Sequence, residues 1–292
     1  MSDDSDIHIM NHRVFRSYAA PEVSVITPAF NAAKFLPRLI ETVRRQKGVP
    51  YEHLIIDDCS TDNSREVLET FAKHDSRIKI LSTGNNAGPI VARNLGVESA
   101  KGRFLAFLDA DDFWLPDKLF IQTEFMKRTG ATASFTDYRH VSEDGRLIGR
   151  LVSGPNHIGW KTHHCSRFIG CLTVMIDRTK VPDFSFGNIS PAYRAEDFLA
   201  WSDCIRKFGP MPRCPHDLAR YSVVEGSRSS NAIRAATSVW KLYHHVEQIP
   251  LAQAGLYFPL YGLFVLVKRL TCRPNKPRDL IDSDFAHTLI DA

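Results

Sequence analysis

The sequence lacks cysteine in the spacing typical of metal fingers, because none of its six cysteines forms a Cys-x-x-Cys pair. A chain of 292 residues can bury a core large enough to fold without disulfides. We therefore expect scattered, reduced thiols, as in a cytosolic protein. The cysteines are Cys59, Cys165, Cys171, Cys204, Cys214 and Cys272.

A strong excess of charge of one sign is also absent. The 37 basic and 33 acidic residues give a net charge of +4, which is too small for a nucleic-acid-binding surface. No nucleic-acid partner is expected, whereas a small anionic ligand or an anionic membrane surface would fit this balance. The acidic start of the chain lacks the apolar run of a secretory signal, so residues 1–20 are predicted to form a disordered tail.

The sequence does contain an alternation of short apolar runs with helical patterns. Apolar, β-type runs at residues 23–30, 53–58, 77–82 and 103–112 are separated by segments of helical spacing. This alternation predicts an α/β fold with a mostly parallel, Rossmann-like sheet and helices on both faces. Further strands are predicted at 131–141, 145–152, 169–178 and the start of 218–231, and further helices at 195–209 and 232–249.

Polar side chains follow three of the predicted strands, at the edge where ligands bind in parallel α/β sheets. Three carboxylates in one short cluster repel one another unless a cation or hydrogen-bond donors offset their charge. A hard divalent cation such as Mg²⁺ or Mn²⁺, completed by phosphate oxygens, would do so. The alternative is that the aspartates cap the following helix, although a cap needs only one of them. The residues are Thr27, Asp57, Asp58, and the cluster Asp109, Asp111 and Asp112.

Four segments carry a family resemblance in their order along the chain: "VSVITPAFNAAKFLPRLIETVRRQ", "LIIDDCSTDNS", "NNAGPIVARNLGVESAKGRFLAFLDADDFWLPDKL" and "AEDFLAWSDC". They resemble the successive signatures of family 2 glycosyltransferases of the GT-A fold, across Val23–Leu119 and more weakly to about Asn231. The segments "GCLTVMIDRTK" and "ARYSVVEGSRSSN" are similar to the bacterial branch that builds surface polysaccharides, the teichuronic-acid type included. The resemblance implies a nucleotide-sugar donor, a divalent metal ion and inversion at the anomeric carbon.

The resemblance also implies nucleotide-binding roles for residues that match the family's motifs. Thr27 and Phe30 would meet the nucleobase at the end of the first strand, and Asp58 would accept a hydrogen bond from a uracil imide. Arg93 would reach the nucleotide or its diphosphate. The alternatives are an Asx cap after Ser60 for Asp58 and a solvated helix cation for Arg93.

The carboxylate cluster matches the family's metal motif. The resemblance implies that Asp109 and Asp111 form this motif beside the nucleotide diphosphate, with Asp111 as a direct metal ligand. Asp112 would instead ligate the metal or position the donor sugar. Many members of the family carry a metal-binding histidine where this chain has Val224 and Glu225, so the metal would rely on aspartate and phosphate.

The reaction also needs a base that removes the proton of the acceptor hydroxyl. The family places it in an acidic pair at the start of a helix, here Glu196 and Asp197; we favour Asp197. The alternative is that both acidic residues stabilise the N-terminus of that helix. The run His163–Cys165 is interpreted as a polar loop near the acceptor rather than a zinc site, because adjacent residues rarely face one metal.

An uncharged stretch at residues 249–267 precedes a strongly basic segment. Its length is borderline for a membrane span, and it contains prolines and glycines. A helix lying among the headgroups of an anionic membrane fits the pattern better, and a buried core or oligomer helix is the alternative. The basic residues that follow are Lys268, Arg269, Arg273, Lys276 and Arg278.

We therefore expect a GT-A catalytic domain at 21–230, divided into a nucleotide-binding half (21–115) and an acceptor half (116–230), with C-terminal helices at 231–292. The predicted function is sugar transfer from a UDP-sugar to a lipid-linked surface polysaccharide, by a peripheral protein at the cytoplasmic face of the plasma membrane. A non-catalytic nucleotide-sugar-binding subunit of a synthase complex is the alternative. A nucleotidyltransferase is disfavoured, because "TPAFNAAKF" replaces a glycine-rich phosphate loop after the first strand.

Overall fold

The computed structural model describes residues 20–148, 151–187, 195–224 and 232–271. Within them lies one nine-stranded sheet, in which the strand order is β3-β2-β1-β4-β8-β6-β9-β5 and β7 pairs with β9. The strands are β1 (Val23–Ala29), β2 (Tyr51–Asp57), β3 (Ile78–Ser82), β4 (Phe104–Phe107), β5 (Phe113–Trp114), β6 (Ala133–Ser142), β7 (His157–Ile158), β8 (Val174–Asp177) and β9 (Met211–Val223).

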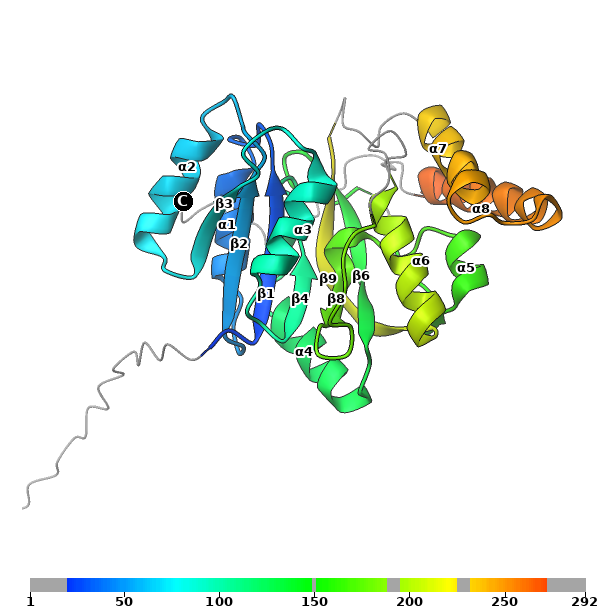
Figure 1. Cartoon of the computed structure of the whole chain (residues 1–292), viewed down its shortest axis with the longest axis horizontal. Helices are drawn as coiled ribbons and strands as arrows, with labels where there is room; N and C mark the ends of the chain where they lie inside the picture. Colours follow the sequence, from blue (N-terminus) through cyan, green and yellow to red (C-terminus); the bar gives the residue numbers. More distant parts are fainter. Residues whose placement is uncertain (1–19, 149–150, 188–194, 225–231, 272–292) are drawn as a thin grey trace, which may run out of the picture.

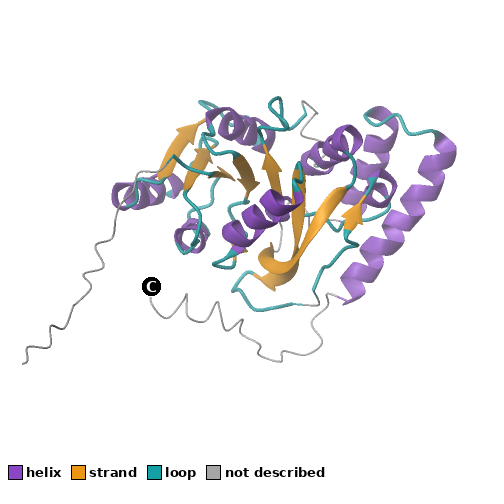
Figure 2. Cartoon of the chain, turned by 90° about the horizontal axis from the view of Figure 1, so that it is seen from below, coloured by secondary structure: helices purple, strands orange, loops and turns teal. Residues whose placement is uncertain are grey.

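Helices cover both faces of this sheet, as predicted (Figures 1 and 2). One face packs against core residues of α1 (Leu36–Arg44), α2 (Ser64–His74) and α4 (Lys118–Thr129). The other face packs against those of α3 (Pro89–Ser99) and α6 (Glu196–Phe208). The remaining described helices are α5 (Trp160–His164), α7 (Ala232–His245) and α8 (Leu251–Thr271).

The short strand β4 shows how the sequence produces these two layers. Successive side chains of a strand point to opposite faces of the sheet. Phe104 and Ala106 accordingly join the core beneath α1, α2 and α4, while Leu105 and Phe107 join the core beneath α3 and α6. All four are fully buried, so a continuous apolar run here means a strand covered on both faces.

The first four strands form the parallel part of the sheet, with α1, α2 and α3 as the connections between them. Close approach of α3 depends on Gly96, because a Cβ atom there would lie 2.6 Å from Ile26 Cγ2 and 2.9 Å from Ile56 Cδ1. A contact that short forces a packed core to shift. Gly96 therefore lets α3, which carries Arg93, pack tightly against β1 and β2.

Beyond β4 the sheet is mixed, and here the sequence reasoning needs correction. Strand β8 is antiparallel to both β4 and β6, β6 is parallel to β9, and β5 and β7 are antiparallel to β9. The α/β class is confirmed, but the parallel pairs dominate only in the first half. The reason is that the chain returns to β4 through β8 from the opposite direction instead of through another helical crossover.

Three strand predictions in this half are wrong in extent. The predicted strand at 145–152 makes only isolated bridges at Leu147 and Val152, and residues 149–150 lie outside the described part. The segment 169–178 begins as a 3₁₀ turn, Cys171–Thr173, and only then becomes β8. Strand β9 starts at Met211, before the predicted position, and lies between β6 and β5 in the sheet.

The C-terminal helices α7 and α8 lie at the end of the molecule opposite α2 (Figure 1). Their inner faces share a third core cluster with α6, in which Phe198 meets Tyr243, Tyr257 and Tyr261. Among the described helices none has the length and apolar character needed to cross a membrane. The predicted tail at 1–19 and the residues after 271 lie outside the described part, and the division at residue 115 stays a prediction.

Candidate active site at the carboxyl edge of the sheet

The segments that follow β1, β2 and β4 lie side by side at one edge. The backbone N–H of Leu108 donates to Ile26 O over 3.0 Å, and that of Asp58 donates to Ala29 O over 2.8 Å. The residues after β4 and after β2 therefore begin on either side of the end of β1. Since strand order reverses around β1 in this sheet, the edge is the position at which open α/β sheets bind ligands.

Arg93 connects two of the predicted acidic sites. Its Nη2 donates to Asp109 Oδ1 over 2.6 Å, and its Nη1 donates to Glu196 Oε1 over 3.1 Å. The side chain is buried, with 5% of the residue exposed, and the guanidinium lies 5.4 Å from the centre of the Phe186 ring. The alternative of a solvated helix cation is wrong. Burial alone would lower the pKa of Arg93, but the charge of Asp109 and then of Glu196 raises it above its ordinary value.

The aspartate cluster occupies a tight turn between β4 and β5 rather than the start of a helix. The N–H of Asp112 closes this turn onto Asp109 O over 3.1 Å, and α4 begins later, after Asp117. Asp112 is 2% exposed, and its Oδ1 accepts the N–H of Ser222 in β9 over 2.8 Å. The helix-cap interpretation of the cluster is therefore wrong, and Asp112 joins the turn to β9.

Negative charge in this turn is only partly compensated. Burial and the charge of Asp109 raise the pKa of Asp111 to about 6. Burial and the charge of Asp111 likewise raise the pKa of Asp112 well above its usual value. Both shifts mean that the cluster would be stabilised by additional positive charge.

Arg38 is a second cation at the cluster that the sequence reasoning missed. Its Nη2 donates to Asp111 O over 2.9 Å and to Ser222 Oγ over 3.1 Å, and its Nη1 donates to Glu143 O over 2.9 Å. The guanidinium also lies 4.8 Å from the centre of the Phe113 ring. The available signal was an arginine between apolar positions of a predicted helix, which by itself does not point to a site.

Asp58 holds the loop that leads into α3. Its Oδ1 accepts bonds from Thr83 Oγ1 (2.7 Å) and the Ala87 N–H (2.9 Å), and its Oδ2 accepts the Gly88 N–H (2.8 Å). The bond to the Ser60 N–H, over 3.1 Å, belongs instead to Asp57. The Asx-turn alternative thus describes Asp57 and not Asp58. A uracil contact by Asp58 stays a prediction, with Oδ2 the less occupied oxygen.

The two predicted nucleobase residues have different environments. Phe30 follows β1 and is 45% exposed, so one face of its ring is available for stacking on a base. Thr27 is fully buried, and its Oγ1 lies 3.0 Å from His53 Nε2. Burial lowers the pKa of His53 to about 3, so this contact is between neutral groups. The Thr27 side chain itself therefore faces the core.

The acidic pair opens α6, and its two members face different cations. Glu196 binds Arg93, whereas Asp197 accepts the N–H of Phe198 over 2.8 Å and lies in the field of Arg167. Burial raises the pKa of Asp197, the charge of Arg167 opposes this, and Glu196 adds to it. The bond from Phe198 shows that Asp197 also stabilises the helix N-terminus, as the alternative interpretation proposed.

The cluster suits a hard metal ion, although no group of three His, Cys, Asp or Glu side chains converges as a metal site within the described residues. The donors are carboxylate oxygens, the ligands that Mg²⁺ and Mn²⁺ prefer, and the raised pKa of Asp111 indicates uncompensated negative charge. Asp109 and Asp111 fit this role with phosphate oxygens as further ligands. Val224 directly follows the end of β9, and Glu225 lies outside the described part.

The histidine run is not the polar loop that we predicted. His163 and His164 are buried in α5, where His163 Nε2 lies 2.9 Å from Phe198 O and His164 Nδ1 lies 2.8 Å from Trp160 O. Burial lowers the pKa of His163 to about 3 and that of His164 to about 4. These residues pack α5 against α6.

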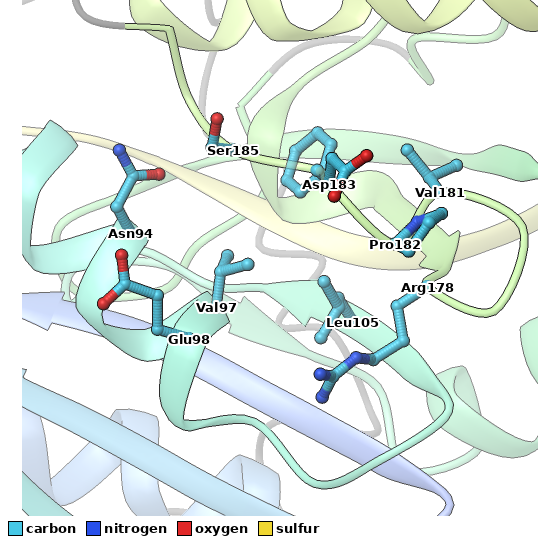
Figure 3. A pocket seen from close by; sticks show the side chains of 10 residues that line it. Asn94, Val97, Glu98, Leu105, Arg178, Val181, Pro182, Asp183 and Ser185 are labelled. Atoms are coloured by element: carbon cyan, nitrogen blue, oxygen red, sulfur yellow. The ribbon is translucent and has the colours of Figure 1, made fainter.

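A cavity of about 240 Å³ lies between α3 and the segment after β8 (Figure 3). Val97, Leu105 and Phe184 form its apolar part, and Glu98 and Arg178 stand at its rim. None of the aspartates of the cluster, and neither member of the acidic pair, lines it. The cavity is therefore separate from the carboxyl edge described above.

Comparison with known proteins agrees with this arrangement. The family model "Glycosyl transferase family 2" matches residues 24–178. The chain is 36% identical over 250 residues to the provisionally assigned teichuronic acid biosynthesis glycosyltransferase TuaG of Bacillus subtilis (strain 168), covering 86% of this chain and 98% of TuaG. The chain belongs to glycosyltransferase family 2.

Other relatives and solved structures extend the comparison. WfgD of Escherichia coli, a UDP-Glc:alpha-D-GlcNAc-diphosphoundecaprenol beta-1,3-glucosyltransferase, is 31% identical over 85% of this chain and 94% of its own length. S. aureus TarS 1-349 in complex with UDP-GlcNAc aligns with a TM-score of 0.60 at 18% identity, covering 92% of this chain and 80% of that one. The mannosyltransferase PcManGT of Pyrobaculum calidifontis, in complex with GDP-Man and Mn²⁺, aligns with a TM-score of 0.59 at 15% identity, covering 94% and 81%. The fold is GT-A.

The raised pKa of Asp111 leads to a stability prediction. A carboxyl pKa of about 6 in the folded chain, against 3.8 as the ordinary value, means that the folded state binds the proton more tightly. Ionised Asp111 therefore destabilises the fold increasingly between about pH 4 and 6, and fully above. We expect Asp111→Asn, without divalent metal, to raise the free energy of unfolding by about 1–2 kcal/mol at pH 8 and to change it little at pH 4.

Urea unfolding at both pH values, with chelator present, measures this difference. Asp117→Asn is the matched control, because Asp117 is an exposed residue of the same segment. An Asp111→Asn variant that gains no stability at pH 8, or gains as much at pH 4, would contradict the account of charge crowding.

Proposed function

We propose that this glycosyltransferase moves a sugar, with inversion at the anomeric carbon, from a UDP-linked donor to a lipid-linked saccharide during the synthesis of a surface polysaccharide. The observation that carries the proposal is the contact of Arg93 with both Asp109 and Glu196. Through it, the acidic turn after β4 and the acidic pair of α6 lie at one edge of the sheet. A donor diphosphate and an acceptor hydroxyl need such neighbouring sites.

The names of relatives support the choice of donor and acceptor. The TarS structures contain UDP and UDP-GlcNAc, and WfgD is named for UDP-Glc and a GlcNAc-diphosphoundecaprenol acceptor. TuaG is named for teichuronic acid biosynthesis. From these we infer a UDP-sugar donor and an undecaprenyl-diphosphate-linked acceptor for this chain.

The donor would occupy the edge between β1 and β4. Phe30 offers an exposed ring to the uracil, and Asp58 keeps the loop before α3 in place beside it. Asp109 and Asp111 would hold Mg²⁺ or Mn²⁺ together with the diphosphate; when bound, the metal supplies positive charge that stabilises the leaving UDP. Asp112, fixed by the N–H of Ser222, would set the position of the donor sugar.

Asp197 is the better base of the acidic pair. The carboxylate of Glu196 already accepts a hydrogen bond from Arg93, which leaves it less available to an acceptor hydroxyl. Burial raises the pKa of Asp197, which strengthens it as a base at neutral pH. In the proposed displacement the acceptor oxygen forms a bond to the anomeric carbon, the bond from that carbon to the diphosphate breaks, and the hydroxyl proton passes to Asp197.

The outer face of α8 fits an anionic lipid surface. Leu256, Leu260, Leu263 and Val267 are exposed and recur at helical spacing, so they share one side of the helix. The sequence that follows is basic, starting at Lys268. Apolar side chains beside basic residues are typical of helices that lie among anionic headgroups. We propose that α8 holds the enzyme at the cytoplasmic membrane face, beside its lipid-linked acceptor.

The first prediction from this proposal concerns the metal. UDP should bind more tightly with Mn²⁺ or Mg²⁺ than with chelator. Asp111→Ala should remove that difference, because the variant lacks the carboxylate that would hold the metal beside the diphosphate. Isothermal titration calorimetry with and without chelator measures both affinities, with Asp117→Ala as the control. An Asp111→Ala variant whose UDP affinity still depends on metal would exclude Asp111 as a ligand.

A second prediction separates the two acidic residues. Asp197→Asn should leave UDP affinity nearly unchanged and lower kcat by about 10²-fold or more, the scale of a lost general base. Glu196→Gln should weaken the Arg93 contact and have a smaller effect on kcat. Steady-state turnover with UDP-sugars and diphosphoundecaprenol-linked acceptors gives both values. The assignment is wrong if the order of the two effects is reversed, and parent protein without turnover would favour the non-catalytic alternative.

A third prediction concerns the membrane. Replacing Leu256, Leu260 and Leu263 together by Gln should lower co-sedimentation with anionic liposomes by about tenfold or more, because each leucine loses its contribution from burial in lipid. Val91→Gln with Phe208→Gln is the control, since both residues are exposed outside α8. Substitution is preferable to deleting α8, whose inner face belongs to the core. Equal sedimentation of the parent, the triple variant and the control would leave α8 as a packing or dimer helix.

A further inference from the structure

Arg167 lies between two aromatic rings that come from different helices. Its guanidinium is 5.7 Å from the centre of the Phe198 ring in α6 and 6.0 Å from the centre of the Tyr261 ring in α8. Such distances are those of cation–π contacts. Tyr261 is 4% exposed and belongs to the inner face of α8, together with Ala254 and Tyr257. The C-terminal helix therefore contacts the segment that follows α5 through Arg167.

Arg167 also acts on the proposed base. Phe198, which stacks with it, directly follows Asp197, and the positive charge of Arg167 favours the ionised form of that carboxylate. The other titratable or charged groups that interact electrostatically with Asp197 are Glu196 on the same helix, Arg93 on α3, and the thiol of Cys171, which follows α5 in the sequence. Among these, Arg167 is a cation that contacts a residue of α8.

We propose that Tyr261 is a positioning residue of the active site: it holds the guanidinium of Arg167 against Phe198 beside Asp197, so that α8 completes the environment of the base. The proposal rests on the proposed function in that Asp197 is taken as the base. Arginine has a long side chain with many rotamers, and two flanking rings restrict it to one region. Figure 1 shows α5, α6 and α8 together at one end of the molecule, where this contact is made.

The proposal assigns different consequences to two neighbouring tyrosines of α8. Tyr257 is 7% exposed and lies one helical turn before Tyr261, but its ring packs against Trp160 and His164 instead of Arg167. Loss of either ring removes similar packing from the same cluster. Only loss of Tyr261 should release Arg167 and weaken its effect on Asp197.

The experiment compares Tyr261→Leu, Tyr261→Phe and Tyr257→Leu in the full chain. The direct readout is the titration of the Asp197 carboxyl by ¹³C NMR, identified by its absence in Asp197→Asn. An opposite charge nearby lowers a carboxyl pKa by 1–3 units. Release of Arg167 in Tyr261→Leu should therefore raise the midpoint by about half a unit to one unit. Tyr261→Phe keeps the ring and should shift it less, and Tyr257→Leu should leave it unchanged.

Turnover provides the second readout. In Tyr261→Leu the acidic limb of the kcat–pH profile should move to higher pH by the same amount, while KM for the UDP-sugar stays unchanged. A midpoint that does not move in Tyr261→Leu, or moves equally in Tyr257→Leu, would overturn the positioning role. A midpoint that moves while Asp197→Asn retains full turnover would keep the positioning role and reject Asp197 as the base.

Discussion

Crowding of negative charge at the carboxyl edge is the constraint on which the rest of the site depends. Five acidic side chains, from the turn after β4 and from the start of α6, gather at this edge of the sheet, where like charges repel one another. Two arginines contact this cluster from opposite faces of the sheet and partly offset its charge. They are the half-buried Arg38 on α1 and the buried Arg93 on α3. The acidic side chains are Asp109, Asp111, Asp112, Glu196 and Asp197.

The negative charge of these carboxylates is compensated to different degrees, so their electrostatic environments differ. Asp109 and Glu196 each have a direct bond to Arg93. Among the described residues no cation bonds the Asp111 carboxylate directly, and burial and the charge of Asp109 raise its pKa although Arg38 and Arg93 lower it. Asp197 lies in the field of Arg167, but burial raises its pKa. Similar carboxyl groups thus acquire different electrostatic environments from their neighbours.

The last strand and the last described helix both contact the acidic edge. Ser222 near the end of β9 bonds both Asp112 and Arg38, so the end of that strand lies against the carboxylate turn. On the other side, Tyr261 brings α8 to Arg167 beside the acidic pair. A helix whose outer face is apolar therefore contacts the site with its inner face. The same helix thus connects an exposed apolar surface to the surroundings of Asp197.

Local pattern in the sequence determined the parallel strands β1 to β4, their helices, and the acidic turn after β4, because short apolar runs and strand-end polarity are readable over a few residues. It also separated Glu196 and Asp197 as a pair. The tertiary structure alone decided that Arg93 bonds two carboxylates distant in sequence, that Arg38 is a second cation, and that β8 returns antiparallel to β4. These features depend on contacts between residues far apart in the sequence, which form only once the sheet and its helices have assembled. Local spacing in the sequence does not encode such contacts.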